Sequence, residues 1–60
     1  MTKFESIRRN AGFTIAQLSE KSGVSAPTIV KIEGGRIENT RIGTLVQLAD
    51  ALGCDIKDFF

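Results

Sequence analysis

The stretch from residue 14 to residue 33, TIAQLSEKSGVSAPTIVKIE, constrains the fold of this chain more than any other. Thr14 is a favoured N-cap residue, and Gln17 three positions later completes a capping box. These signals predict a short helix that runs to about Lys21. Gly23 supplies the permissive backbone that a sharp reversal of the chain needs, so the helix should stop just before it. A second short helix is expected directly after this turn.

The start of the second helix can be placed in two ways. Ser25 is a good N-cap residue, and Pro27 is tolerated in a first turn because the N–H groups there lack helical partners. However, the residue before a proline avoids the helical region, which favours a start at Pro27 with Ala26 as the cap. In both cases Ile29 and Ile32 define the inward face of the helix.

Two short helices around a glycine-containing turn form the layout that places a recognition helix in the major groove of DNA. Over residues 7–60 the chain resembles the Cro/CI-type (XRE-like) helix-turn-helix domain of bacterial and phage repressors. The segments that carry the resemblance are IRR and AGFT within residues 7–14, QLSEKSGVS (17–25), TIVKIEGGR (28–36) and TLVQLADALG (44–53). The resemblance implies a compact all-α domain of five helices that binds specific double-stranded DNA, usually as a dimer.

Length and composition restrict the protein class further. Sixty residues are enough for one domain, residues 1–60, with a small and compact core. The apolar runs are only a few residues long, and no signal peptide is recognisable. The single cysteine, Cys54, cannot form an internal disulfide. We therefore expect a cytoplasmic protein with no membrane association.

Charge is unevenly distributed along the chain, although the net charge is only +1. Residues 1–36 contain six basic and three acidic residues and therefore carry +3. Residues 37–60 contain two basic and four acidic residues and therefore carry −2. The positive half holds the helix-turn-helix (residues 14–33), as binding to a polyanion requires.

The first helix is predicted over residues 3–10, with Gly12 just beyond its end. Phe4, Ile7 and Ala11 recur at helical spacing, so they are expected to form its buried stripe.

Arg8 falls within this stripe, because at about 100° per residue it lies about 40° from Phe4. A buried charge needs a partner, and Glu33 lies at the same angle from the inward-facing Ile29. We therefore expect a structural ion pair between Arg8 and Glu33, and the family resemblance implies the same pairing. The alternative is two unrelated surface charges.

The outward face of the second helix of the unit carries the residues expected to meet DNA bases. Lys31 can donate to guanine O6 or N7, whereas Ala26, Pro27 and Val30 can touch thymine methyl groups. No Asn, Gln or Arg lies on this face, so specificity would rest on methyl contacts, DNA shape and the spacing of two copies. Alternatively, Pro27 and Val30 form an apolar spot for another protein.

Residues 34–40 (GGRIENT) are polar and contain two glycines, which predicts an irregular, exposed loop. Arg36 and Arg41 flank this loop and are the leading candidates for contacts to DNA phosphates. Neutral side chains can add phosphate contacts, and the candidates are Thr14, Ser25, Thr28, Asn39 and Thr40.

The second half of the chain predicts a longer helix over about residues 41–52, capped by Thr40 and stopped by Gly53. Its apolar stripe is Ile42, Leu45, Leu48, Ala49 and Leu52. Asp55 should cap a last helix over residues 56–60, in which Ile56 and Phe59 close the core. Phe60 is left over, and a terminal aromatic residue is either frayed or part of a dimer contact. Because similar repressors pair through this C-terminal region, we expect Phe60 near the contact of a two-fold symmetric dimer.

The residue inventory argues against an enzyme. The chain has no His and one Cys, so it cannot assemble a Ser-His-Asp, Cys-His or zinc-ligand cluster. The Gly34-Gly35 pair lacks the following Lys-Ser/Thr of a nucleotide-binding loop. We expect no catalytic residue, no metal and no cofactor.

The leading hypothesis is a small transcriptional regulator that acts as a homodimeric repressor on a near-palindromic DNA operator. A second hypothesis is an antitoxin-like or other protein-interaction module, whose partner (a toxin or a regulator) would contact Ile15, Val30 and Phe60. Ile15 itself either packs against Phe13 or is exposed. A third is the N-terminal DNA-binding domain of a longer regulator.

Overall fold

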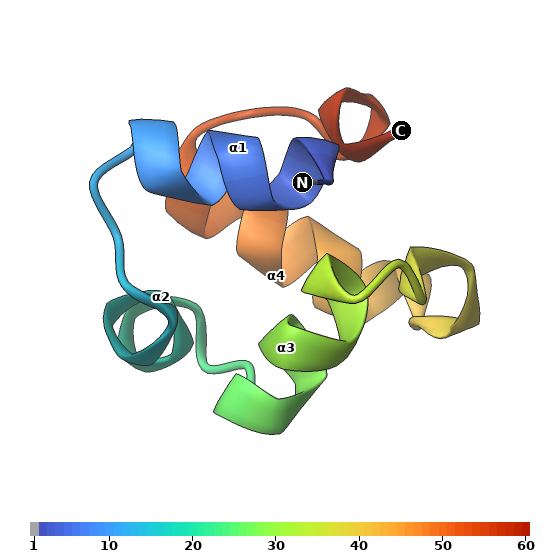
Figure 1. Ribbon diagram of the computed structural model, residues 1–60, viewed down its shortest axis with the longest axis horizontal. Coiled ribbons are helices and arrows are strands. Elements are labelled where there is room, and N and C mark those ends of the chain that lie inside the picture. Colours follow the sequence, from blue (N-terminus) through green and yellow to red (C-terminus); the bar gives the residue numbers. More distant parts are fainter. Residues whose placement is uncertain (1) are drawn as a thin grey trace.

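The computed structural model describes residues 2–60, which form four α-helices and two short 3₁₀ turns and contain no strand. The elements are α1 (Lys3–Asn10), α2 (Ile15–Ser22), α3 (Ala26–Glu33), η1 (Ile37–Asn39), α4 (Ile42–Leu52) and η2 (Ile56–Phe59). In Figure 1, α1 and η2 lie at the top, α2 and α3 lie at the bottom, and α4 runs between these two pairs. The predicted all-α fold is confirmed. No helix within residues 2–60 is long and apolar enough to span a membrane.

Helix α1 has the predicted bounds. The backbone N–H of Glu5 donates to Oγ1 of the N-cap residue Thr2 at 3.2 Å. Gly12 follows the helix with a φ of +83°. The prediction that Ala11 is buried is wrong: α1 ends at Asn10, and Ala11 is its exposed C-cap residue.

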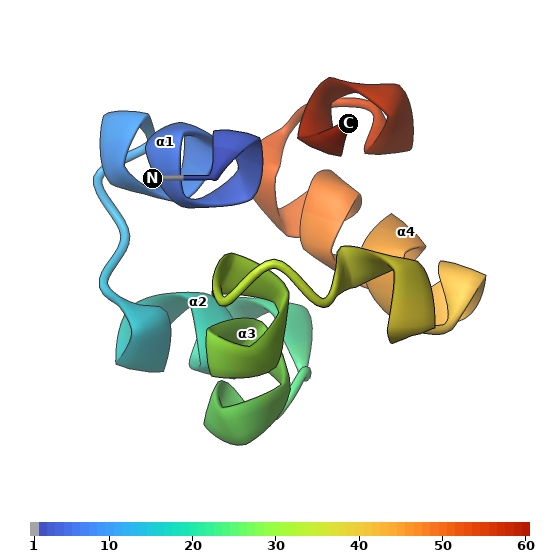
Figure 2. The same cartoon turned by 45° about the vertical axis from the view of Figure 1, so that its right-hand side comes forward.

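The core is formed by every helix and by η2. Its buried apolar residues are Phe4, Leu18, Val24, Ile29, Ile32, Leu45, Leu48, Ala49 and Phe59. The rings of Phe4 and Phe59 meet edge to face with their centroids 5.0 Å apart. This contact joins the first helix to the last turn, and the two elements lie side by side in Figures 1 and 2.

The start of α4 differs from the prediction in two ways. Thr40 is not its cap, because the helix starts at Ile42 after Arg41, and the Thr40 hydroxyl donates instead to the carbonyl of Arg36 at 3.3 Å. Ile42 is 67% exposed rather than part of the core. It lies in the first turn of α4 and only about 20° from the buried Ala49, so the helical repeat does not account for its exposure. Leu45 and Leu48 are buried as predicted.

The two remaining corrections concern short turns. The connection between α3 and α4 is not wholly irregular, because it contains η1, and Ile37 packs against the core. Figure 2 shows η1 beside the first turn of α4. The expected fifth helix is the 3₁₀ turn η2, which ends at Phe59 and leaves Phe60 outside it, 57% exposed.

Candidate nucleic-acid interface

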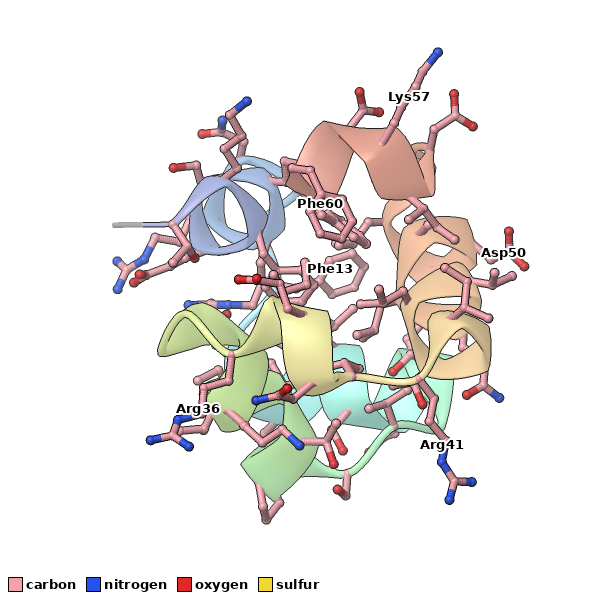
Figure 3. All side chains as sticks on the ribbon, turned by 90° about the vertical axis from the view of Figure 1, so that its right-hand side faces the viewer. Phe13, Arg36, Arg41, Asp50, Lys57 and Phe60 are labelled. Carbon is pink, nitrogen blue, oxygen red and sulfur yellow. The ribbon has the colours of Figure 1, made fainter. Side chains whose placement is uncertain are left out.

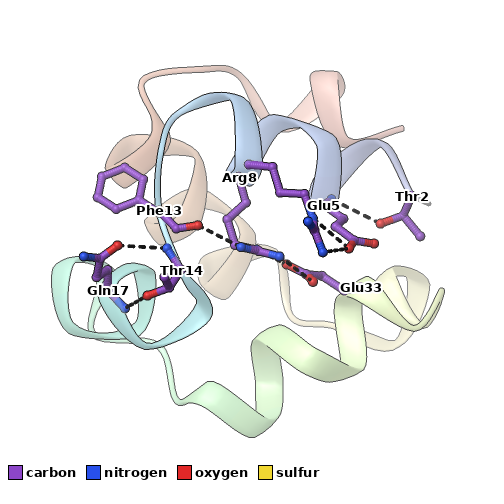
Figure 4. Close-up of polar contacts among 8 residues, drawn as sticks. Thr2, Glu5, Arg8, Phe13, Thr14, Gln17 and Glu33 are labelled. Atoms are coloured by element: carbon purple, nitrogen blue, oxygen red, sulfur yellow. Dashed lines mark hydrogen bonds and ion pairs between the residues drawn. The ribbon is translucent and has the colours of Figure 1, made fainter.

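Helix α2 is fixed at both ends by local hydrogen bonds. The N–H of Gln17 donates to Thr14 Oγ1 at 3.1 Å, and the N–H of Thr14 donates to Gln17 Oε1 at 2.9 Å, which is the predicted capping box (Figure 4). At the other end Gly23 has a φ of +78°, in the left-handed region that favours glycine. Ser22 donates to the Leu18 carbonyl at 2.7 Å and accepts from the Val24 N–H at 3.2 Å. The reversal between the two helices is therefore built from residues 22–24.

Three buried side chains hold α3 against the rest of the domain. Val24 in the turn is buried, and Ile29 and Ile32 on α3 are buried almost completely. Ser25 is the N-cap residue and Ala26 the first helical residue, which decides between the two predicted starts, although Ser25 makes no side-chain cap bond. This packing fixes which face of α3 points outward.

The outward face of α3 is open to solvent. Pro27, Val30 and Lys31 are exposed, and Val30 is 54% exposed although it is a valine. Ala26 and Thr28 at the flanks are half-buried. Because Ile29 and Ile32 point into the core, Val30 and its exposed neighbours are free to contact another molecule.

The ion pair expected between Arg8 and Glu33 is present and ties α1 to the end of α3. Nε of Arg8 donates to Glu33 Oε2, and one terminal nitrogen donates to Glu33 Oε1 at 3.2 Å. The other terminal nitrogen donates to the Phe13 carbonyl at 2.7 Å (Figure 4). The hydrogen bond to Glu33 raises the pKa of Arg8 despite its burial, so the guanidinium stays charged. The sequence did not predict the contact with Phe13, because a backbone carbonyl leaves no signature in the side-chain pattern.

The hydroxyl groups near α3 are partly occupied within the domain. Ser25 Oγ and Thr28 Oγ1 are 2.8 Å apart, so one donates to the other. The Thr14 hydroxyl accepts from Gln17 but keeps its own hydrogen. The Thr40 hydroxyl is directed at the Arg36 carbonyl. A phosphate contact from Thr40 would therefore require this hydroxyl to rotate.

Two arginines flank α3 at the lower edge of the molecule in Figure 3, Arg36 on one side and Arg41 on the other. Both are exposed, as are Lys31 and Asn39. Within residues 2–60 the ion pairs are Arg8–Glu33 and Arg9–Glu5, so Lys31, Arg36 and Arg41 have no intramolecular carboxylate partner. Lys57 lies at the opposite end of the molecule (Figure 3). Positive charge therefore surrounds the outward face of α3 and is free to pair with an external anion.

Ile15 and Phe60 lie outside this arrangement. Ile15 is half-buried and packs against the core, so the exposed alternative is wrong. Phe60 is near η2 in Figure 3, away from Arg36 and Arg41. A contact that the sequence did not predict places the Lys21 ammonium 5.3 Å from the centre of the Phe13 ring.

Titratable groups do not gather into a second site in the part of the chain that the structure describes. No group of three or more Asp, Glu, Cys or His residues is placed to hold a metal ion there. Burial raises the pKa of the Cys54 thiol, and the negative charges of Asp58 and Asp55 raise it further. The thiol is therefore protonated at neutral pH and is a poor nucleophile.

Comparison with protein families shows that residues 3–60 match a model described as the Cro/C1-type HTH DNA-binding domain. Comparison with curated proteins and with solved structures gives no match. The family match spans α1 to η2 and includes all the residues of the outward face described above.

Proposed function

This chain belongs to the Cro/C1-type helix-turn-helix DNA-binding family, and we propose that it is a small transcriptional regulator that binds a specific double-stranded DNA operator through α3. The observation that carries the proposal is the outward face of α3, which is exposed and has three unpaired basic side chains on it and around it. Such a face fits the major groove, with the basic groups directed at the phosphates.

The proposed base contacts are on α3 itself. They are Ala26, Pro27, Val30 and Lys31. The proposed phosphate contacts surround them, and these residues are Thr14, Ser25, Thr28, Arg36, Asn39, Thr40 and Arg41. This division follows the usual one, in which groove-facing side chains give sequence specificity and surrounding groups fix the position on the duplex.

We further propose that the regulator binds as a two-fold symmetric dimer and represses transcription by blocking access to its operator. Phe60 supports this because it is a large aromatic residue, 57% exposed and away from the proposed DNA face. A dimer would place two copies of α3 in successive major grooves, about 34 Å apart.

We propose a cytoplasmic location and a binding role without catalysis or cofactor. The absence of His and the protonated Cys54 thiol support the non-catalytic role.

Selection of bound duplexes from a random DNA pool at near-physiological salt tests the proposal. We expect enrichment of a symmetric site whose half-sites are about one helical turn apart. Enrichment of no sequence, with retention that disappears on adding a little salt, would leave only non-specific phosphate attraction and would refute the proposal. The same selection with the variant Phe60→Ala tests the proposed dimer contact. We expect this variant to bind single half-sites and no longer to enrich the symmetric site.

The phosphate contacts are tested by neutralising one arginine at a time. Arg36→Gln and Arg41→Gln should each weaken binding to all duplexes similarly and lower the slope of log K against log salt by about 1. Lys57→Gln is the matched control, because it removes the same charge at the far end of the molecule (Figure 3). An equal change of slope in all three variants would mean that net charge acts at long range, and the assignment of Arg36 and Arg41 would be wrong.

A further inference from the structure

The outward face of α3 has few groups that can form hydrogen bonds to bases. Arg, Lys, Asn and Gln are the residues that make bidentate contacts with purines, and Lys31 is the one member of this set in α3 (APTIVKIE). The nearest candidate, Gln17 on α2, uses its side-chain oxygen in the capping box with Thr14. Ser25 and Thr28 are hydrogen-bonded to each other. Lys31 is therefore the one strong donor that this face offers freely.

Apolar groups dominate the rest of the face. Val30 is 54% exposed and Pro27 is exposed, whereas Ile29 and Ile32 on the same helix are buried almost completely. Among the groups displayed in the major groove, the thymine 5-methyl is the one suited to an apolar side chain. Pro27 and Val30 are three residues apart, which corresponds to about 4.5 Å along the helix axis. This spacing is close to one base step of about 3.4 Å.

We propose that α3 reads its operator mainly through thymine methyl groups. Pro27 and Val30 contact two thymines in neighbouring base pairs, and Lys31 contacts an adjacent guanine. This inference rests on the proposed function and adds the chemistry of recognition to it. The expected half-site contains a thymine-containing step beside a G·C pair. Methyl groups, more than hydrogen bonds to bases, determine the affinity for this half-site.

Deoxyuridine substitution tests the proposal directly, because deoxyuridine pairs like thymidine and lacks only the 5-methyl group. In the selected operator, each thymine of a half-site is replaced in turn and the dissociation constant is measured. We expect a loss of about fourfold for each contacted thymine, which is the factor that about 0.8 kcal/mol per buried methyl-sized group corresponds to. Two positions per half-site should respond.

A variant assigns one of these positions to Val30. In Val30→Ala, deoxyuridine should no longer weaken binding at one of the two positions and should still weaken it at the other. Because Val30 is exposed, the variant is expected to fold, and circular dichroism checks this. Val46→Ala is the matched control: Val46 is also an exposed valine, 43% exposed, but lies on α4, so this variant should keep both deoxyuridine effects.

The two possible failures are distinguishable. If the random pool yields no specific duplex, the proposed function fails and the methyl readout fails with it. If it yields an operator that tolerates deoxyuridine at every thymine, or if Val30→Ala retains both effects, DNA binding stands and the methyl readout is wrong.

Discussion

Two neighbouring arginines of α1 form ion pairs that differ in burial and in the distance along the chain to their partners. Arg8 pairs with Glu33, 25 positions along the chain, and the two side chains are 8% and 11% exposed. Arg9 pairs with Glu5 one helical turn away at 2.9 Å, and its side chain is 59% exposed. The chemistry is the same, and only the angular position on the helix differs. Arg8 therefore acts as a tertiary link and Arg9 as a local one.

Burial determines how much stability the protein loses when each ion pair is broken. The guanidinium of Arg8 has hydrogen bonds to both oxygens of Glu33 and to the Phe13 carbonyl, so removal of either charge leaves the other one poorly solvated. The side chains of Arg9 and Glu5 are more exposed, 59% and 20%, so their charges stay better solvated when this pair breaks. The pKa of Arg8 is raised in the folded protein. The charged guanidinium therefore stabilises the fold, and this stability is lost only as the pH rises through the folded-state pKa of Arg8. The guanidinium of Arg8 is therefore charged at every pH near neutrality.

The largest effect is expected from Arg8→Met, which keeps the aliphatic bulk and removes the charge. It leaves the Glu33 carboxylate and the Phe13 carbonyl without their donor, and we expect a loss of about 3–5 kcal/mol in the free energy of unfolding. That is most of the stability of a domain this small. Urea denaturation followed by circular dichroism measures it, since the chain has no Trp or Tyr for fluorescence. A loss similar to that of Arg9→Met would contradict the comparison.

Glu33→Gln should have an intermediate effect, because the amide oxygen of Gln can still accept one hydrogen bond from the guanidinium. We expect a loss of about 1.5–3 kcal/mol, the usual range for a hydrogen bond to a charged group. Urea denaturation again measures the free energy of unfolding.

The double variant Arg8→Met with Glu33→Leu replaces both charges by apolar groups and should recover much of the loss in the free energy of unfolding. A double variant no more stable than Arg8→Met alone would mean that the unpaired Glu33 charge is not the cause of the loss, which would then be due to the lost contact with Phe13.

The smallest effect is expected from Glu5→Gln, which breaks the exposed pair. The loss should be about 0.3–0.5 kcal/mol and should shrink as salt is added, because exposed charges are screened. Unfolding curves at low and high salt test this, with Arg9→Gln as the reciprocal variant. A loss that persists at high salt would mean that the effect of Glu5 is not that of a screened ion pair.

The sequence predicted the parts of the fold that depend on local signals. The capping box at Thr14, the reversal at Gly23 and the inward face of α3 all follow from short-range rules, and the structure contains them. The ion pair between Arg8 and Glu33 could be predicted because both angular positions follow from the helical repeat alone. Each of these features needs only a few neighbouring residues to be specified.

The features that the sequence did not predict depend on distant packing. Ile37 packs against the core, so the segment around it forms η1, although its composition is that of a loop. Ile42 fits the helical repeat of α4 but no element covers it. For the candidate site, the pattern gave the outward residues of α3, but the hydrogen bonds of Ser25 and Thr40 depend on side-chain rotation, which a one-dimensional pattern does not encode.

The contact between Phe4 and Phe59 has a consequence for how the domain folds. The two rings come from opposite ends of the described chain, so their contact closes a loop that contains nearly the whole domain. Partial structures that lack η2 expose Phe4 to water and lose its contribution to the core. The domain therefore gains little by folding in stages, and the slowest-exchanging amides of α1 and α4 should open together in a single cooperative event.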